Sequence, residues 1–152
     1  MKVSLHDWLE DGWLTEHQTS PQEIADLLTV AERDLNDCWA AKTARLSPDW
    51  QLNIAYNAAL QVATAALAAS GYRASREAHH YRVIQSLTHT IDADAGLVAQ
   101  LDGFRKKRNI SDYERSGMVS EQEAEEMLTL AENLRTRVIE WLHTNHSKLL
   151  QE

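Results

Sequence analysis

The segment covering residues 48–69 limits the possible folds of this chain more than any other feature. It follows Ser47, begins with Pro48, contains eight alanines and ends shortly before Gly71. Alanine favours the helix, and proline is tolerated in the first helical turn. Small side chains on several faces let neighbouring helices approach closely. The segment therefore predicts a central helix that is buried on several sides and stops at Gly71.

Four further segments repeat apolar residues at helical spacing. The first and the last begin with expected capping boxes, Ser20 with Glu23 and Ser120 with Glu123. These helices cover roughly residues 20–44, 79–91, 97–108 and 120–142. Two prolines and five glycines are too few for the turns of a sheet protein. We predict an all-α fold: an antiparallel bundle of four long helices plus one shorter helix.

The domain organisation is expected to be simple. Residues 1–19 form an N-terminal arm that packs on the bundle as a short helix, and residues 20–152 form the bundle domain. Trp8 and Trp13 on this arm are expected to cover the bundle or a dimer partner. The other tryptophans lie on or beside apolar stripes, which predicts core or interface positions: Trp39, Trp50 and Trp141.

The chain shows no pattern typical of secretion or membrane insertion. Cys38 is the only cysteine, which excludes an internal disulfide, and its apolar stripe predicts a small buried hydrophobe. Acidic residues follow the N-terminus too early for a signal peptide. The longest apolar run, around residues 62–69, is too short to span a bilayer. We expect a cytoplasmic protein that does not enter a membrane.

The charge is acidic overall but uneven. A net charge of −8 disfavours autonomous tight binding to nucleic acid. A local basic cluster, residues 105–108, could nevertheless hold a nucleotide or short RNA, or dock a partner. The sequence lacks a Walker or Rossmann glycine loop, Gly-x-Ser-x-Gly and a zinc knuckle, so enzymes built on those sites are excluded. His143 and His146 have no third metal ligand nearby, and we expect neither a metal nor a cofactor.

Arg108 falls where the helical periodicity would place an apolar core residue. A guanidinium at a helix interface needs acceptors, because an unpaired buried charge is costly. One interpretation is an ion pair with Asp112 that closes the helix end. The other is a phosphate-binding or catalytic arginine in a cleft between helices.

Several motifs occur in an order that resembles the HEPN family (higher eukaryotes and prokaryotes nucleotide-binding). They are Ala-Tyr-Asn-Ala-Ala at 55–59, Gly-Tyr-Arg at 71–73, His79-His80, and Arg108-Asn109 with Asp112-Tyr113. The similarity extends from about residue 20 to 142. It implies a helical bundle that commonly forms homodimers. Many members are encoded with a minimal nucleotidyltransferase as toxin and antitoxin, and many are metal-independent endoribonucleases.

The ribonuclease members of that family carry an arginine, usually followed by a polar residue, and a histidine four to six residues further on. Here Arg108 and Asn109 are followed in that window by Asp112 and Tyr113, without a histidine. The chain thus resembles a HEPN subgroup that lacks the catalytic histidine. An imidazole exchanges protons near neutral pH, whereas a phenol with a pKa of about 10 does so poorly. Nuclease activity is therefore in doubt.

The resemblance also places the 79–80 histidine pair near Arg108. Adjacent histidines on a helix point in different directions, so at most one of them can face this arginine. The alternative is that a histidine at the helix start only bonds to a neighbouring backbone group. Together with the basic cluster, the candidate nucleotide- or phosphate-binding residues are Arg105, Lys107, Arg108, Asp112, His79 and His80.

Three functions follow as hypotheses. The first is a HEPN-type module that binds a nucleotide, RNA or a partner protein, as half of a toxin–antitoxin-like pair with a nucleotidyltransferase. The second is a metal-independent endoribonuclease with Arg108, Asn109 and Tyr113 as candidate catalytic residues, assisted by a histidine of the 79–80 pair. The third is a structural dimeric adaptor in which Arg108 is paired internally.

Overall fold

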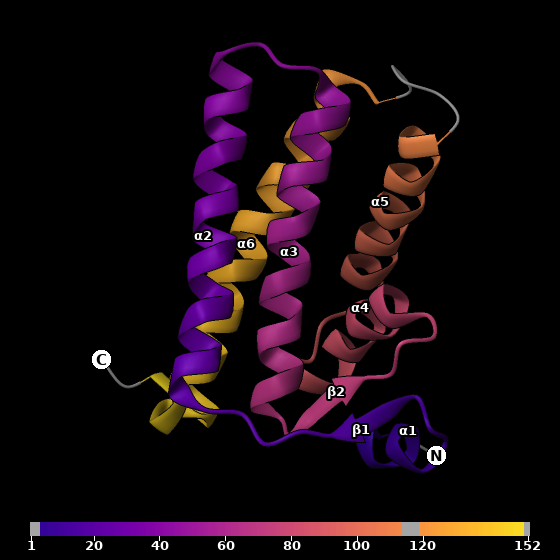
Figure 1. Cartoon of the computed structure of the whole chain (residues 1–152), viewed down its shortest axis with the longest axis vertical. Helices are drawn as coiled ribbons and strands as arrows, with labels where there is room; N and C mark the ends of the chain where they lie inside the picture. Colours follow the sequence, from indigo (N-terminus) through magenta and orange to yellow (C-terminus); the bar gives the residue numbers. More distant parts are fainter. Residues whose placement is uncertain (1–3, 114–118, 151–152) are drawn as a thin grey trace.

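The structure is a computed structural model that describes residues 4–113 and 119–150, with side chains described up to Arg108 in the first range. Four long helices form its main body (Figure 1): α2 (Pro21–Thr43), α3 (Pro48–Ala69), α5 (Ala95–Tyr113) and α6 (Glu121–Asn145). α2 and α5 run in one direction, whereas α3 and α6 run in the opposite direction. The shorter helix α4 (His79–Thr90) precedes α5. The predicted helical fold is confirmed in outline, and the structure adds a small two-stranded sheet to it.

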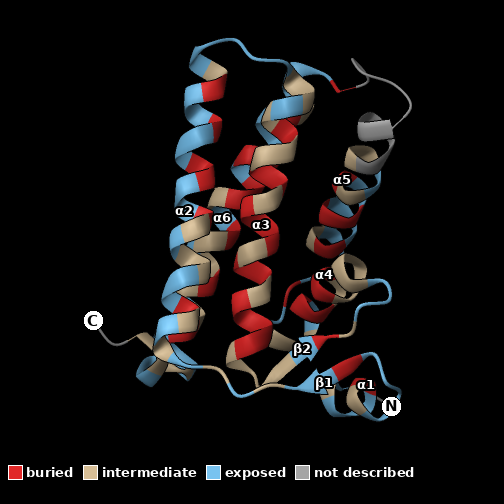
Figure 2. Ribbon diagram, viewed as in Figure 1, coloured by how far each residue is buried: buried red, intermediate tan, exposed pale blue. Residues whose placement is uncertain are grey.

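α3 is the central helix that its composition predicts. It contacts α2, α6, α4 and α5. Ser47 caps it by accepting a hydrogen bond from the backbone N–H of Trp50 at 3.2 Å, and Gly71 ends it at a φ of +97°. Buried positions recur along most of the length of α3 (Figure 2). By length and composition α3 could also cross a membrane, but 67% of its apolar window is buried within the protein, as in core helices.

The two predicted capping boxes differ in outcome. At the start of α6, Ser120 and Glu123 bond reciprocally to each other's backbone N–H, as predicted. At the start of α2, Ser20 accepts from the N–H of Glu23 at 3.1 Å, but the glutamate does not bond back. Its carboxylate instead accepts from Thr19 at 2.6 Å. Side-chain groups of Thr19 and His17 contact this carboxylate in place of the backbone N–H, so the second half of this box was predicted wrongly.

The N-terminal arm contains a strand that the sequence did not predict. After α1 (Leu5–Glu10), strand β1 (Leu14–Glu16) pairs antiparallel with β2 (Tyr72–Ala74). The predicted short helix of the arm is present as α1, but it does not include Trp13 and Leu14. Strands of three residues are too short to show alternation, and their pairing joins distant parts of the chain. A short 3₁₀ helix (Ser147–Leu150) lies near the C-terminus.

The tryptophans occupy different environments. Trp8 is buried, and its ring meets that of Trp13 edge-on with centres 5.8 Å apart. Trp39 and Trp50 are 46% and 54% exposed, so neither is a core residue. Of the two positions that the sequence allowed, core or interface, only the interface remains for them. Trp39 lies near the end of α2 and Trp50 in the first turn of α3, and Nε1 of Trp39 donates to Glu132 of α6 at 3.0 Å. Trp141 is half-buried and packs beside His146.

Candidate phosphate-binding site

Arg108 lies on the face of α5 that is turned toward α3. Its guanidinium carbon is 5.3 Å from the ring centre of Tyr56, a side chain that is 1% exposed. The Nε of Arg108 is buried and has no hydrogen-bond partner among the described residues. The prediction that this arginine faces a helix interface is confirmed. Its Nε–H remains available to an acceptor that the described part of the chain does not supply.

The other three members of the basic cluster are paired with carboxylates. Asp102 accepts from Nε of Arg105 at 2.7 Å and lies 3.6 Å from Nζ of Lys106. Lys107 is paired with Glu123 of α6. Arg108 therefore differs from its three neighbours, because no carboxylate in the described ranges forms an ion pair with it.

Three of the predicted site residues have side chains outside the described part of the chain: Asn109, Asp112 and Tyr113. Their backbone continues helix α5, which ends at Tyr113. The predicted pair between Arg108 and Asp112, and the catalytic assistance expected from Asn109 and Tyr113, thus remain predictions.

His80, on α4, lies beside Tyr56, as Arg108 does. Its Nδ1 is 3.4 Å from the hydroxyl oxygen of Tyr56. Burial lowers the pKa of His80, and the positive charges of Arg108, of a protonated neighbouring imidazole and of Arg105 lower it further. Burial raises the pKa of Tyr56 to about 12, although the two arginines act in the opposite direction. Near neutral pH the imidazole of His80 and the phenol of Tyr56 are therefore neutral, and the guanidinium of Arg108 is a permanent cation.

His79 points to a different neighbour. Its Nδ1 lies 3.1 Å from the carbonyl oxygen of Ala74, the backbone contact that the alternative interpretation expected of a helix-start histidine. A carbonyl oxygen only accepts, so Nδ1 of His79 carries the proton. Of the two histidines only His80 contacts Tyr56, in agreement with the prediction that one at most would face Arg108.

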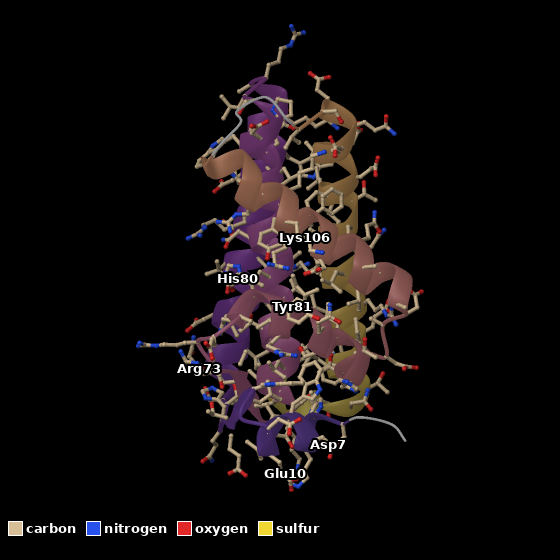
Figure 3. All side chains as sticks on the ribbon, turned by 90° about the vertical axis from the view of Figure 1, so that its right-hand side faces the viewer. Asp7, Glu10, Arg73, His80, Tyr81 and Lys106 are labelled. Atoms are coloured by element: carbon tan, nitrogen blue, oxygen red, sulfur yellow. The ribbon has the colours of Figure 1, made fainter. Side chains whose placement is uncertain are left out.

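Both histidines line a depression of about 560 Å³ on the outer side of α4 and α5. We call it the basic depression; its charged and aromatic members are Arg76, His79, His80, Tyr81 and Arg105. Figure 3 shows His80, Tyr81 and Lys106 on this side of the molecule. The structure thus brings together candidates that are some 25 residues apart in the sequence.

On the other side, Arg108 lines a groove of about 720 Å³ between α2 and α3. We call it the α2–α3 groove. The exposed indole of Trp50 forms part of its wall, as do the amide of Asn57 and the carboxylate of Asp34. Nδ2 of Asn57 donates to Oδ2 of Asp34 at 2.6 Å, which fixes both side chains. Sequence reasoning did not single out Asp34, Asn57 or Tyr56 as site residues, although the quoted motif at 55–59 contains the last two.

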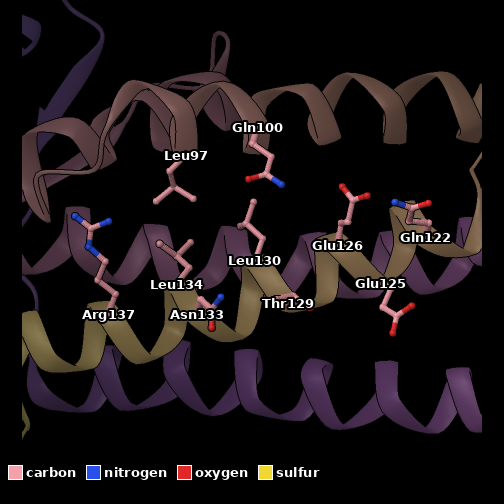
Figure 4. Close-up of a pocket in the computed structure, with 10 residues that line it drawn as sticks. All are labelled: Leu97, Gln100, Gln122, Glu125, Glu126, Thr129, Leu130, Asn133, Leu134 and Arg137. Carbon is pink, nitrogen blue, oxygen red and sulfur yellow. The ribbon is translucent and has the colours of Figure 1, made fainter.

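A third hollow lies between α5 and α6 and holds none of the predicted site residues. It has a volume of about 550 Å³. In Figure 4, Leu97 of α5 faces Leu130 and Leu134 of α6, with Arg137 near one end and Gln122 near the other. Nη2 of Arg137 donates to the carbonyl oxygens of Ile91 and Asp92 at 3.0 and 3.1 Å, so this arginine supports the α4–α5 connection.

Within the described ranges, no three histidine, cysteine or acidic side chains are grouped so that they could hold a metal ion. Cys38 is buried, as its apolar stripe predicts, and burial raises the pKa of its thiol to about 11.

No protein-family model matches the chain, and no curated protein is similar to it in sequence. The function therefore has to be argued from the site itself. Arg108 can bind an anion through its unsatisfied Nε–H, and the adjacent neutral imidazole can accept a proton.

Proposed function

We propose that this chain is a HEPN-type module that binds the phosphate of a nucleotide or of RNA through Arg108. The observation that carries the proposal is the buried Nε of this arginine, which lacks an acceptor among the described residues. A buried donor without a partner costs free energy, and a phosphate oxygen would remove that cost. The planar guanidinium also matches two phosphate oxygens at once.

The surroundings of Arg108 support a nucleotide rather than a simple anion. On one side, the basic depression offers the guanidinium of Arg76 to a further phosphate, whereas Arg105 is already paired with Asp102. On the other side, Trp50 is 54% exposed in the α2–α3 groove, where its indole can stack on a base. Because the whole chain carries a net charge of −8, which repels phosphate, binding should be confined to the few cationic side chains at this site.

The first experiment is a titration of the protein with adenosine monophosphate and with a short single-stranded RNA. We expect Arg108→Ala to weaken binding of either ligand by about tenfold or more, since hydrogen bonds to charged groups contribute about 1.5–3 kcal/mol. Lys106→Ala is the matched control, because it removes the same charge from an exposed side chain two residues away. Equal losses in the two variants would show that only net charge matters and would contradict the proposal.

The two ligands separate the two sources of phosphate. Tight binding of RNA with weak binding of the mononucleotide would identify a strand as the ligand. Comparable affinities would identify a nucleotide site. If neither ligand binds in a saturable way at low salt, the phosphate proposal is wrong, and partner docking or the structural adaptor takes its place.

A specific observation favours a second candidate, metal-independent ribonuclease activity. His80 is the one described histidine in contact with Tyr56, and Arg108 lies over the same ring. A neutral imidazole could take a proton from the ribose hydroxyl while the guanidinium stabilises the charge on the phosphate. This role would replace the histidine that the resemblance expects after Arg108.

The test is RNA cleavage in EDTA by highly purified protein. Activity that disappears in Arg108→Ala and in His80→Ala, but not in His6→Ala on the exposed arm, would establish the nuclease with this residue as base. Tyr113→Phe reports whether the phenol takes part. Persistent absence of cleavage above background would leave binding as the function of the isolated domain.

The partners implied by the resemblance form part of the same proposal: a homodimer and a minimal nucleotidyltransferase. The exposed Trp39, Leu46 and Trp50 support a protein contact at the α2–α3 end of the bundle. Sedimentation of the wild type and of Trp39→Ala would test the dimer. We expect the variant to shift toward the monomer, while a monomeric wild type at all concentrations would contradict this part of the proposal.

A further inference from the structure

A smaller pocket lies at the other end of α3, next to the two-stranded sheet. It has a volume of about 230 Å³ and is formed by the β1–α2 connection, α2, α3, β2 and α4. We call it the sheet pocket. One part of its wall is apolar: Leu67 and Val83 are each 1% exposed, and Ala68 is 5% exposed. The polar part consists of less buried side chains, namely His17, Glu23, Thr64, Tyr72, Arg73 and His79.

Glu23 places an ionised carboxylate in this wall. Its Oε1 accepts from the hydroxyl of Thr19 at 2.6 Å and lies 2.7 Å from Nε2 of His17. The hydrogen bond from Thr19 and the contacts with His17 hold the pKa of the carboxyl below its usual value, although burial acts the other way. No described residue donates to Oε2 of Glu23. This oxygen is therefore free to accept from a ligand.

The hydrogen bonds of the histidines fix which of their nitrogens are free. An ionised carboxylate only accepts, so Nε2 of His17 donates to Glu23 and Nδ1 keeps its lone pair in the neutral ring. Nδ1 of His79 donates to the Ala74 carbonyl oxygen, which leaves the lone pair on Nε2. Each neutral histidine thus has one remaining nitrogen, and it can only accept.

The hydroxyl of Thr64 adds another acceptor, because it already donates to the carbonyl oxygen of Leu60 at 2.8 Å. Arg73 is a permanent cation that also lines the pocket, but it occupies the exposed position of β2 and is the smallest of the causes that lower the pKa of Glu23. Apart from this exposed guanidinium, the polar wall offers several acceptors and one negative charge, and the hydroxyl of Tyr72 can also donate.

We propose that the sheet pocket binds a small primary ammonium ion that carries an apolar body. A primary ammonium has three N–H donors, no acceptor and one positive charge, which complements the free acceptors and the carboxylate of Glu23. The apolar wall formed by Leu67, Ala68 and Val83 accommodates a short hydrocarbon body. The negative charge of the whole chain raises the local concentration of such cations. This site is separate from Arg108 and does not depend on the phosphate proposal.

The test is a titration of the full chain with ethyl-, n-propyl- and n-butylammonium chloride, followed by NMR of residues around the pocket. We expect saturable binding that strengthens by about fourfold per added methylene group while the apolar wall is being filled. Butyrate has a similar size but the opposite charge, and we expect it not to bind. n-Butyltrimethylammonium keeps the charge without N–H donors, and it should bind more weakly than n-butylammonium.

Variants assign the binding to Glu23. Glu23→Gln keeps the size of the side chain and removes its charge, and we expect n-butylammonium to bind about tenfold more weakly or worse. Asp26→Asn is the matched control, because it removes the same charge from an exposed position of α2 outside the pocket. An unchanged helical circular dichroism spectrum would establish that Glu23→Gln is folded.

Three results would overturn the proposal. They are the absence of saturable binding by all three alkylammonium ions, binding of butyrate as tight as that of n-butylammonium, and equal effects of Glu23→Gln and Asp26→Asn. Thr64→Val gives an independent check, because it preserves the shape of the side chain and removes an acceptor. It should weaken n-butylammonium binding without changing the stability of the bundle by much.

Discussion

The guanidinium of Arg108 lies over the ring of Tyr56, with 5.3 Å between the guanidinium carbon and the ring centre. The hydroxyl of the same tyrosine is 3.4 Å from Nδ1 of His80. One buried phenol on α3 therefore holds a cation from α5 and an imidazole from α4 within reach of each other. This arrangement makes the charge state of the histidine sensitive to the arginine.

We predict that Arg108→Gln raises the pKa of His80. Burial is the largest cause of its lowered pKa, and the charge of Arg108 is the next. Removing that charge should move the pKa back toward its ordinary value without restoring it fully. The measurement is an NMR titration of the imidazole Cε1 proton. Lys106→Gln is the control and should leave this pKa nearly unchanged, so equal shifts in both variants would speak against a specific Arg108–His80 interaction.

The same histidine should make stability depend on pH in the mildly acidic range. Because the folded pKa of His80 lies below the usual value of about 6.5, the unfolded chain binds more protons between these two values. Stability should therefore fall as the pH drops from about 6.5 toward the folded pKa, and this loss should be complete below it. Glu23 and Glu123 also have lowered pKa values, and their contribution to the stability of the protein is lost only as the pH falls below their usual value of 4.5.

Urea unfolding at several pH values between about 7.5 and 5 would measure this dependence. In His80→Gln the fall in unfolding free energy should be smaller than in the wild type. His6→Gln serves as the control, because this exposed histidine contacts only an exposed glutamate. A fall of the same size in His80→Gln and the wild type would mean that another group titrates.

Ala78 is expected to be a site where glycine stabilises the protein. It precedes α4 with a φ of +53°, and no side chain caps the helix there. The left-handed conformation costs an L-residue about 1–2 kcal/mol, whereas the added freedom of glycine in the unfolded chain costs about 0.5–1 kcal/mol. Ala78→Gly should thus raise the unfolding free energy by up to about 1 kcal/mol. Ala40→Gly, in the exposed interior of α2, should lower it by about 1 kcal/mol.

Arg137 should contribute more to stability than other partly exposed cations. Its two hydrogen bonds go to backbone carbonyls of the α4–α5 connection, where Asp92 has a φ of +57°. We expect Arg137→Ala to lower the unfolding free energy by about 1–3 kcal/mol, because both carbonyls lose a charged donor. Lys148→Ala, at an exposed position near the C-terminus, should change it by less than about 0.5 kcal/mol. Similar effects of the two substitutions in denaturant unfolding would refute this role.

The candidate site was predictable only in part. The periodicity placed Arg108 at a helix interface, and the motif order placed the 79–80 histidines near it, yet neither could show which histidine faces the arginine. The pairing of Lys107 with Glu123 was hidden, because the two residues lie on different helices, whereas Asp102 and Arg105 have the i,i+3 spacing of neighbours on one helix. Tyr56 was missed as a site residue, since a buried aromatic on an alanine-rich helix is indistinguishable from core.

The sequence by itself determined the helices, their order and most of their ends. Alanine content, apolar periodicity and the serine caps act within a few residues, so they predicted α2, α3, α4 and α6 closely. The tertiary structure alone decided the pairing of β1 with β2, the exposure of Trp39 and Trp50, and the meeting of Arg108, Tyr56 and His80. These features depend on contacts between residues far apart in the chain, and short-range preferences contain no information about which distant groups will meet.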